Sequence, residues 1–381
     1  MGMQDYEGYQ ALCVPHRPVD AHDALAVLED GYAIRGANLR RIATERDDTF
    51  AVTASGRSGP QWILKIEHPM ESREAVRMRA EALRSLQEHE PDLPVTRILA
   101  GTDGQLVSAY RQGDESRAVT LTTFLPGQVL AQSEHAPTDL LLFAMGDSLA
   151  RIQSVLARQR AFEDRLGRVL WDIRLLPDIA EGTLPEMDNA EIRSAVEHAV
   201  ESYLSVSSQV ESLPESMCHG DFHPGNLTVE PSRPNALAGI MDFGDMHMMP
   251  PICDVGTCLC YGVDADASSQ APLEACRRLL QGYLWSVRND ASSPQVMHGD
   301  EDTLALLPTL MEARSALALV LPIMAQLQAG VDPDHYLSGP QARLGRLNVM
   351  QSHSKQELLE MLGLGDAGRE DPRVAGDRLS T

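Results

Sequence analysis

Two short segments carry the residues best suited to do chemistry. The first is His219-Gly-Asp-Phe-His-Pro-Gly-Asn226, and the second is Asp242-Phe-Gly-Asp245. Phosphoryl transfer from a nucleotide needs a carboxylate that orients the attacking hydroxyl and accepts its proton. It also needs an amide oxygen and a second carboxylate that hold Mg²⁺. Asp221 fits the first role, and Asn226 and Asp242 fit the other two.

The chain between these motifs can bring the two metal ligands together. Residues 227–230 are typical of a short strand, residues 231–235 of a turn, and residues 238–242 of the returning strand. Such a hairpin would place Asn226 and Asp242 at the same end, where one metal ion could touch both. The alternative is a hairpin of an unrelated α/β protein whose acidic residues are turn formers. The ordered spacing of both motifs argues against that alternative.

The two motifs resemble those of the aminoglycoside phosphotransferase and choline kinase group of small-molecule kinases. Protein kinases usually carry an Arg between the His and the Asp of the first motif, where this chain has Gly220. His223 also belongs to the small-molecule pattern. The broad resemblance covers roughly residues 22–330. It implies an α+β, bilobal protein-kinase-like fold, with a small antiparallel β-sheet in the N-lobe and a mainly helical C-lobe.

Three stretches are more similar to hydroxylysine kinase-like members of this group. They are Glu45-Arg-Asp-Asp-Thr-Phe50, Thr123-Phe-Leu-Pro-Gly127 and Ile240-Met-Asp-Phe-Gly-Asp-Met246. The similarity implies that ATP or GTP donates a phosphoryl group, with Mg²⁺, to a hydroxylated amino acid or an amino alcohol. An aminoglycoside acceptor stays open as the enzymatic alternative.

An amine-bearing acceptor needs a carboxylate for its ammonium group, and its own carboxylate would need an Arg. Asp245, Glu312 and Arg314 lie in the segments that line the acceptor cleft of this family. Each of the three could also be a structural or solvated residue.

The pattern along the chain predicts two lobes between two irregular ends. Residues 1–21 are expected to form a loose arm, 22–126 the N-lobe, 127–364 the C-lobe and 365–381 a disordered tail. A five-stranded antiparallel sheet with one prominent helix is expected in the N-lobe. Its strand-like runs lie near residues 39–43, 50–55, 62–66, 95–99, 106–109 and 118–124, and its helix at 72–89.

The C-lobe is expected to be built from long helices. Helical periodicity marks residues 140–159, 189–210 and 303–329. Pro308 and Pro322 are the expected breaks or kinks in the last of them.

Lys65 is the candidate that binds the nucleotide phosphates. It lies near the end of the predicted strand 62–66 and is the only lysine in the N-terminal half of the chain. The kinase mechanism needs such a strand lysine, held by a glutamate of the next helix. Glu81 is the predicted partner and Glu74 the alternative. A solvated edge-strand lysine is the alternative for Lys65 itself.

The usual glycine-rich phosphate loop is absent before Lys65, and residues 44–50 stand in its place. Asp48 and Thr49 could cap a turn over the phosphates through backbone N–H groups, or belong to an ordinary β-turn. Residues 122–130 are expected to connect the lobes. Backbone groups there, at Thr123 and Phe124, are expected to meet the nucleotide base, which leaves the choice of ATP or GTP open.

Three further residues are expected to support the catalytic loop. His219 would brace it, against the segment of Asp242 or simply as a packed core histidine. By the resemblance, Asp254 would tie the loop down through backbone N–H groups. His223 is either a loop support or a substrate contact.

The formal net charge of −23 argues against nucleic acid and against anionic membranes as partners. It is compatible with a cationic acceptor, although a solvated acidic surface would give the same total. The sequence contains no apolar run near the roughly 20 residues that span a bilayer, and its N-terminus does not resemble a secretory signal. A cytoplasmic protein is therefore expected, with its oligomeric state open.

The remaining features favour no other chemistry. Cys253, Cys258 and Cys260 have neither zinc-ligand nor disulfide-framework spacing, and are expected to be buried on a helix. A catalytically silent nucleotide-binding module is a rival interpretation that the intact catalytic set opposes. A protein kinase is opposed by Gly220 and by the lack of an Ala-Pro-Glu segment after Asp242-Phe-Gly.

Overall fold

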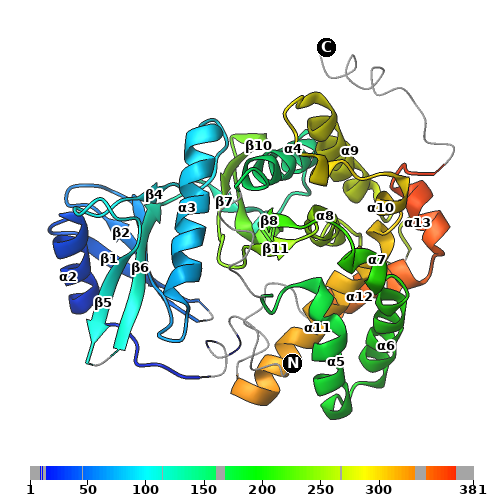
Figure 1. The fold of residues 1–381 in the computed structure, drawn as a ribbon, viewed down its shortest axis with the longest axis horizontal. Helices are drawn as coiled ribbons and strands as arrows, with labels where there is room; N and C mark the ends of the chain where they lie inside the picture. The colour runs from blue at the N-terminus through cyan, green and yellow to red at the C-terminus, as the bar shows by residue number, and fades with distance from the viewer. Residues whose placement is uncertain are drawn as a thin grey trace.

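A computed structural model describes residues 9, 11, 14–44, 46–113, 115–159, 168–266, 268–330 and 340–365. A small lobe built on one β-sheet lies beside a larger lobe made mainly of helices (Figure 1). The predicted bilobal α+β fold is therefore confirmed. The predicted tail lies, apart from Gly365, outside the described residues.

The sheet of the small lobe is antiparallel throughout. It has six strands, one near each of the six strand-like runs of the sequence, and not the five expected in the sheet. The nine-residue β6 is long enough to pair with β5 along its first half and with β4 along its second half. The strand order is β1-β2-β3-β6-β4, with β5 also on β6. The bounds are β1 Asn38–Ile42, β2 Asp48–Thr53, β3 Trp62–Ile66, β4 Ile98–Leu99, β5 Ser108–Gln112 and β6 Glu115–Thr123.

Helices cover both faces of this sheet (Figure 1). Helix α2, Ala21–Tyr32, closes a small apolar core in which its Leu28 meets Phe50 and Leu64 of the strands. Helix α3, Arg73–His89, lies on the side of the larger lobe, and its apolar positions join the main core of the molecule. The sheet is thus held from both sides, which fixes where its strands present their polar side chains.

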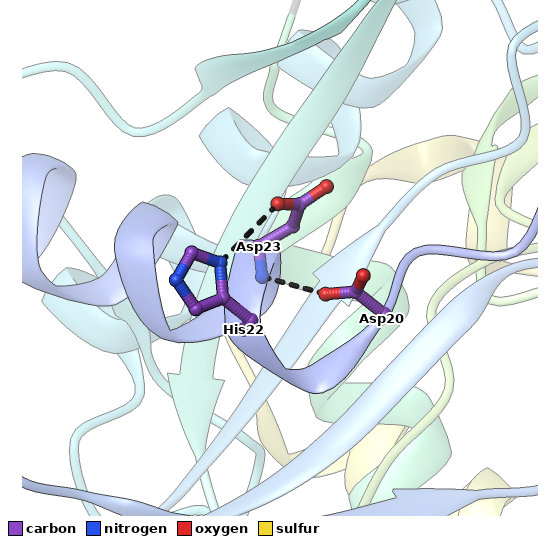
Figure 2. Close-up of side chains that lie close together, drawn as sticks. All are labelled: Asp20, His22 and Asp23. Atoms are coloured by element: carbon purple, nitrogen blue, oxygen red, sulfur yellow. Dashed lines mark hydrogen bonds and ion pairs between the residues drawn. The ribbon is translucent and has the colours of Figure 1, made fainter.

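Among the described residues, the start of α2 holds the one group of three His, Cys, Asp or Glu side chains whose potential ligand atoms lie within 4.8 Å of one another. Figure 2 shows Asp20, His22 and Asp23 around the first turn of this helix. Asp20 Oδ1 accepts a hydrogen bond of 2.9 Å from the Asp23 N–H, as an N-cap does. The Asp23 carboxylate accepts the Tyr110 hydroxyl at 2.5 Å. The Asp20 carboxylate therefore caps the helix, and the Asp23 carboxylate fastens it to β5.

The N-terminal segment over residues 14–20 is packed, contrary to the prediction of a loose arm. The Val14 carbonyl oxygen lies 2.8 Å from His68 Nε2, and the Arg17 carbonyl oxygen accepts a hydrogen bond from Arg117. Val19 is completely buried. Because these contacts come from residues far along the chain, no local pattern in the segment could indicate them.

The larger lobe adds two small sheets and the helices that enclose them. In the first sheet, β9 lies between β7 and β10; the bounds are β7 Gln128–Val129, β9 Leu227–Glu230 and β10 Arg233–Ile240. The second sheet pairs β8, Ser216–Cys218, with β11, His247–Met249. The helices are α4 Asp139–Leu156, α5 Leu176–Thr183, α6 Ala190–Leu204, α7 Ser207–Glu211, α8 Pro251–Cys260, α9 Glu274–Asn289, α10 Glu301–Leu304, α11 Leu307–Ala329, α12 Pro340–Gln351 and α13 Lys355–Met361. The predicted helix 189–210 is divided between α6 and α7.

Helices α4 and α9 cross at two glycines. A Cβ atom at Gly146 would lie 1.9 Å from the Leu279 carbonyl oxygen, and one at Gly282 would lie 2.0 Å from the Phe143 carbonyl oxygen. Any side chain at either position would force the two helices apart.

Helix α11 lies in the centre of the larger lobe and packs against α5, α6, α8 and α12. It continues through Pro322, so the predicted break is absent there. Pro308 lies in its first turn, next to the interruption between α10 and α11. The contacts on all sides hold the helix against the cost of about 3 kcal/mol that an interior proline carries. Residues 301–327 are long and apolar enough to cross a membrane by composition, and 89% of their most apolar window is buried inside the molecule.

Candidate active site

The hairpin between the two motifs forms as predicted. Strands β9 and β10 pair with Ile240 opposite Leu227, and the Met241 N–H donates to the Asn226 carbonyl oxygen at 2.9 Å. Asn226 immediately precedes the outgoing strand, and Asp242 follows two residues after the returning strand. The antiparallel register therefore brings both residues to one end of the hairpin.

Asp221 lies at the centre of a polar cluster. Its Oδ2 accepts a hydrogen bond of 3.0 Å from Asn226 Nδ2 and lies 3.2 Å from His223 Nε2, while its Oδ1 accepts from Arg314. The His223 Nδ1 accepts from the Gly225 N–H at 3.0 Å, so the ring proton belongs to Nε2 and is donated to Asp221.

The charge of Asp221 follows from this cluster. Burial by itself would raise the pKa of its carboxyl, but His223 and Arg314 outweigh burial and hold the pKa below its usual range. The group is ionised at neutral pH. Such a carboxylate can orient a hydroxyl by accepting its hydrogen bond, and it is a weak base in the resting site.

The loop that carries Asp221 is tied down from beneath by Asp254. The His219 N–H donates to Asp254 Oδ2 at 3.2 Å, and the Gly220 N–H donates to Oδ1 at 3.0 Å. His219 itself is fully buried, with Nδ1 accepting from the Asp221 N–H at 3.3 Å and Nε2 facing the Met241 carbonyl oxygen at 3.3 Å. These contacts join the two motifs and agree with the loop-supporting positions expected of His219 and Asp254.

Gly220 is required by the shape of this loop. Its φ is +80°, and a Cβ atom there would lie 2.3 Å from the Asp245 carbonyl oxygen. The second motif therefore packs directly against the backbone of the first. An Arg, which protein kinases carry at this point, would have no room.

Asn226 and Asp242 offer oxygen atoms of the kind that Mg²⁺ prefers. The Asn226 amide nitrogen donates to the Asp221 carbonyl oxygen at 2.9 Å and to its carboxylate, which leaves the amide oxygen without a donor among the described residues. Asp242 is exposed, and its left-handed backbone, with φ of +58°, turns the chain at this position. The donor set fits a magnesium ion.

Lys65 points toward the second motif. A Cβ atom at Gly244 would lie 3.0 Å from Asp242 Oδ1 and 3.7 Å from Lys65 Nζ. The ammonium group therefore stands beside the predicted metal ligand. Its ion pairs are with Asp47, at 2.8 Å, and with Glu67, at 3.4 Å.

The predicted ion pair between Lys65 and Glu81 is wrong. Within the described part of the chain, Lys65 is paired with Asp47 and Glu67, and Glu81 of α3 has no ion pair. The reason is the two-residue period of a strand, which puts Lys65 and Glu67 on the same face. Carboxylates supplied at the ends of β2 and β3 replace the helix glutamate. Burial, with Asp47 nearby, raises the pKa of the Glu67 carboxyl to about 7.

Asp48 does not face the nucleotide side, contrary to the prediction. Its side chain is buried on the face of the sheet opposite to Lys65. There its carboxylate accepts from Arg117 at 2.8 Å, from Arg41, and from His16 at 3.1 Å. Thr49 is the cross-strand partner of Lys65 and so shares its face. Side chains alternate along the chain, so the residues facing Lys65 are Asp47 and Thr49, on either side of Asp48.

The backbone N–H groups of Thr123 and Phe124, two of the groups expected to meet the nucleotide base, are used within the fold. The Thr123 N–H donates to the Arg97 carbonyl oxygen at 2.9 Å, and the Phe124 N–H donates to the Gln61 carbonyl oxygen at 2.8 Å. Neither N–H is available to a nucleotide base in this arrangement.

Asp245 is occupied by a residue of the small lobe. Arg46, from the segment that replaces the glycine-rich loop, lies 3.2 Å from Asp245 Oδ1. Burial raises the pKa of the Asp245 carboxyl, and Arg46 partly offsets this effect. The contact links two segments 199 residues apart and bridges the two lobes.

Glu312 is not in the cleft, contrary to the prediction. Its carboxylate accepts from Ser202 and from Gln351, each at 2.9 Å, and from Lys355. It therefore pins α11 to α6, α12 and α13. Arg314, two residues later, meets Asp221 instead, because residues two apart on a helix face different sides.

Sequence reasoning missed the aromatic residues around Arg314. Its guanidinium stacks over the Trp171 ring at 4.5 Å and lies 5.7 Å from the centre of the Tyr261 ring. Tyr261 also stacks on His223, with ring centres 4.7 Å apart. These residues come from separate parts of the chain and form no motif. No signal in the local sequence therefore pointed to Trp171.

Comparisons with known proteins identify the family of this chain. The model of the phosphotransferase enzyme family matches residues 38–295. Hydroxylysine kinase from Danio rerio is 26% identical over 264 residues, which cover 66% of this chain and 72% of that protein.

Two solved structures share the fold, each with a TM-score of 0.63 and 17% identity. One is the amicoumacin kinase hAmiN in complex with AMP-PNP, Ca²⁺ and Ami. The match covers 88% of this chain and 95% of that kinase. The other is the microcompartment-associated aminopropanol kinase. The match covers 90% of this chain and 98% of that kinase. The family match spans well over half of the sequence and includes both catalytic motifs. The chain belongs to the phosphotransferase enzyme family and is a small-molecule kinase.

Proposed function

We propose that this enzyme transfers the terminal phosphoryl group of ATP or GTP to the hydroxyl of a hydroxylated amino acid of the hydroxylysine type. The observation that carries the catalytic part is the meeting of Asp221, Asn226 and Asp242 at one end of a hairpin, with Lys65 beside them. The acceptor class is supported by the similarity to hydroxylysine kinase over two thirds of the chain.

Each residue of the cluster has a task that its surroundings support. Asp221 accepts the hydrogen bond of the acceptor hydroxyl, aims its oxygen at the phosphorus, and takes up the proton as the new bond forms. Arg314 and His223 hold that carboxylate in place and keep it ionised. Catalysis of this kind depends on position and charge, and the anchored loop provides both.

The phosphate side is served by Lys65, Asn226 and Asp242. Lys65 neutralises phosphate oxygens, with Asp47 and Glu67 fixing the direction of its ammonium group. Asn226 and Asp242 would hold Mg²⁺, which when bound neutralises the charge on the transferred group.

A nucleotide-consumption screen tests the proposal. Purified protein is incubated with ATP or GTP and with hydroxylated amino acids, amino alcohols, aminoglycosides or neutral sugars. Turnover is expected with hydroxylated amino acids and is expected to fall about 10²- to 10⁴-fold in Asp221→Asn, the range for a positioned acid–base group. Turnover with aminoglycosides or neutral sugars alone would refute the acceptor class and leave the kinase assignment standing.

A further inference from the structure

Arg346 of α12 is a cation that has no matching anion among the described residues. Its guanidinium lies 5.4 Å from the centre of the Tyr261 ring, and its Nε is buried with no hydrogen-bond partner. Within the described part of the chain, no carboxylate lies within ion-pair distance of it. A half-buried charge of this kind is costly unless something pairs with it, which indicates a site for an anionic ligand.

The position of Arg346 connects it to the reacting centre. The Tyr261 ring that it approaches stacks on His223 at 4.7 Å, and His223 Nε2 lies 3.2 Å from Asp221. The Tyr261 hydroxyl also accepts from Arg314 at 3.2 Å. One aromatic ring and one imidazole therefore separate the unpaired guanidinium from the carboxylate that receives the acceptor hydroxyl.

The charges around this cluster are divided between its two ends. Carboxylates gather on the loops of the two motifs, at Asp221, Asp242 and Asp245, and guanidinium groups come from α11 and α12. Arg314 is neutralised by Asp221, whereas Arg346 leaves one positive charge over. The end at Arg346 therefore favours an anion.

We propose that Arg346 binds the carboxylate of the acceptor while the acceptor hydroxyl rests on Asp221, an inference that rests on the proposed function. Arginine suits this task because its planar donors match the two oxygens of a carboxylate. The arrangement selects an acceptor whose carboxylate lies several bonds away from the reacting hydroxyl, at the other end of the molecule. Hydroxylysine phosphorylated on its side-chain hydroxyl has this form.

The test compares each hydroxylated amino acid with the amino alcohol that lacks its carboxylate. In the wild type, the carboxylated acceptor is expected to have the higher kcat/KM by about 10- to 100-fold, the value of a hydrogen-bonded charge pair. R346Q should reduce this ratio toward unity through a higher KM, and R346K, which keeps the charge, should retain part of it. R288Q, the same substitution at an exposed arginine of α9, should keep the wild-type ratio.

Each outcome decides the inference. An unchanged ratio in R346Q, or a wild type that prefers the amino alcohols, overturns it and leaves the proposed reaction standing. If no amine-bearing alcohol is phosphorylated, the proposed function fails, and calorimetry with L-lysine and the non-hydrolysable nucleotide AMP-PNP decides the subsite. Binding that weakens at least about tenfold in R346Q supports the carboxylate site, and equal or undetectable binding in both proteins refutes it.

Discussion

Asp47→Asn is expected to weaken nucleotide binding about 10- to 100-fold. The Asp47 carboxylate lies 2.8 Å from Lys65 Nζ, and its side chain is only 9% exposed. The same carboxylate accepts from the His68 N–H at 2.8 Å, and an amide oxygen can keep that bond, so the substitution removes mainly the charge. A hydrogen bond between charged groups contributes about 1.5–3 kcal/mol, and each 1.36 kcal/mol is about tenfold.

Calorimetric titration with Mg²⁺ and AMP-PNP measures this effect without knowledge of the acceptor. Glu81→Gln is the matched control, because it makes the same chemical change on α3, where no described residue pairs with the glutamate. Its dissociation constant should stay within about threefold of the wild type. Thermal unfolding of both variants guards against a general loss of structure.

Two results would refute the conclusion that Asp47 holds Lys65 in position for the nucleotide. One is a Glu81→Gln variant that loses as much affinity as Asp47→Asn, which would mean that α3 moves to meet Lys65 once nucleotide binds. The other is an Asp47→Asn variant with unchanged affinity, which would leave Glu67 alone, at 3.4 Å, as sufficient support.

Three further expectations follow from the described contacts. Asp242→Ala should raise the Mg²⁺ concentration needed for half-maximal nucleotide binding, and an unchanged Mg²⁺ titration would show that Asp242 is no metal ligand. Asp254→Asn should lower the free energy of unfolding in urea by about 1–3 kcal/mol, because one buried acceptor of two loop N–H groups is lost; a change near zero would contradict the anchoring role. Burial raises the pKa of the Glu67 carboxyl from 4.5 to about 7, so its contribution to stability is complete below the lower value and is lost as the pH rises through the higher one. The Tm of Glu67→Gln should therefore rise relative to the wild type between about pH 5 and about pH 8, and a constant difference would contradict the shift.

The sequence by itself determined the chemical centre, because that centre is built locally. Asp221, Asn226 and Asp242 lie within one loop and one hairpin, and antiparallel pairing of adjacent strands follows from spacing and turn residues. Lys65 was also predictable, as a lone lysine in a clear strand. Asp254 was found through the family pattern, and the structure places its carboxylate under the loop.

Only the tertiary structure decided which charged residues serve that centre. Asp47, not Asp48, holds Lys65, because a shift of one residue turns a strand side chain to the other face of the sheet. Glu312 and Arg314 are separated in the same manner by the turn of a helix.

The partners that come from distant segments leave no trace in local spacing. Arg46 meets Asp245 across 199 residues, and Arg314 meets Asp221 across 93. Arg346 reaches Tyr261 only because α12 packs beside α11 and α8 ends next to the catalytic loop. Side-chain periodicity reports which face of an element is buried, and it carries no information about which element will lie opposite that face.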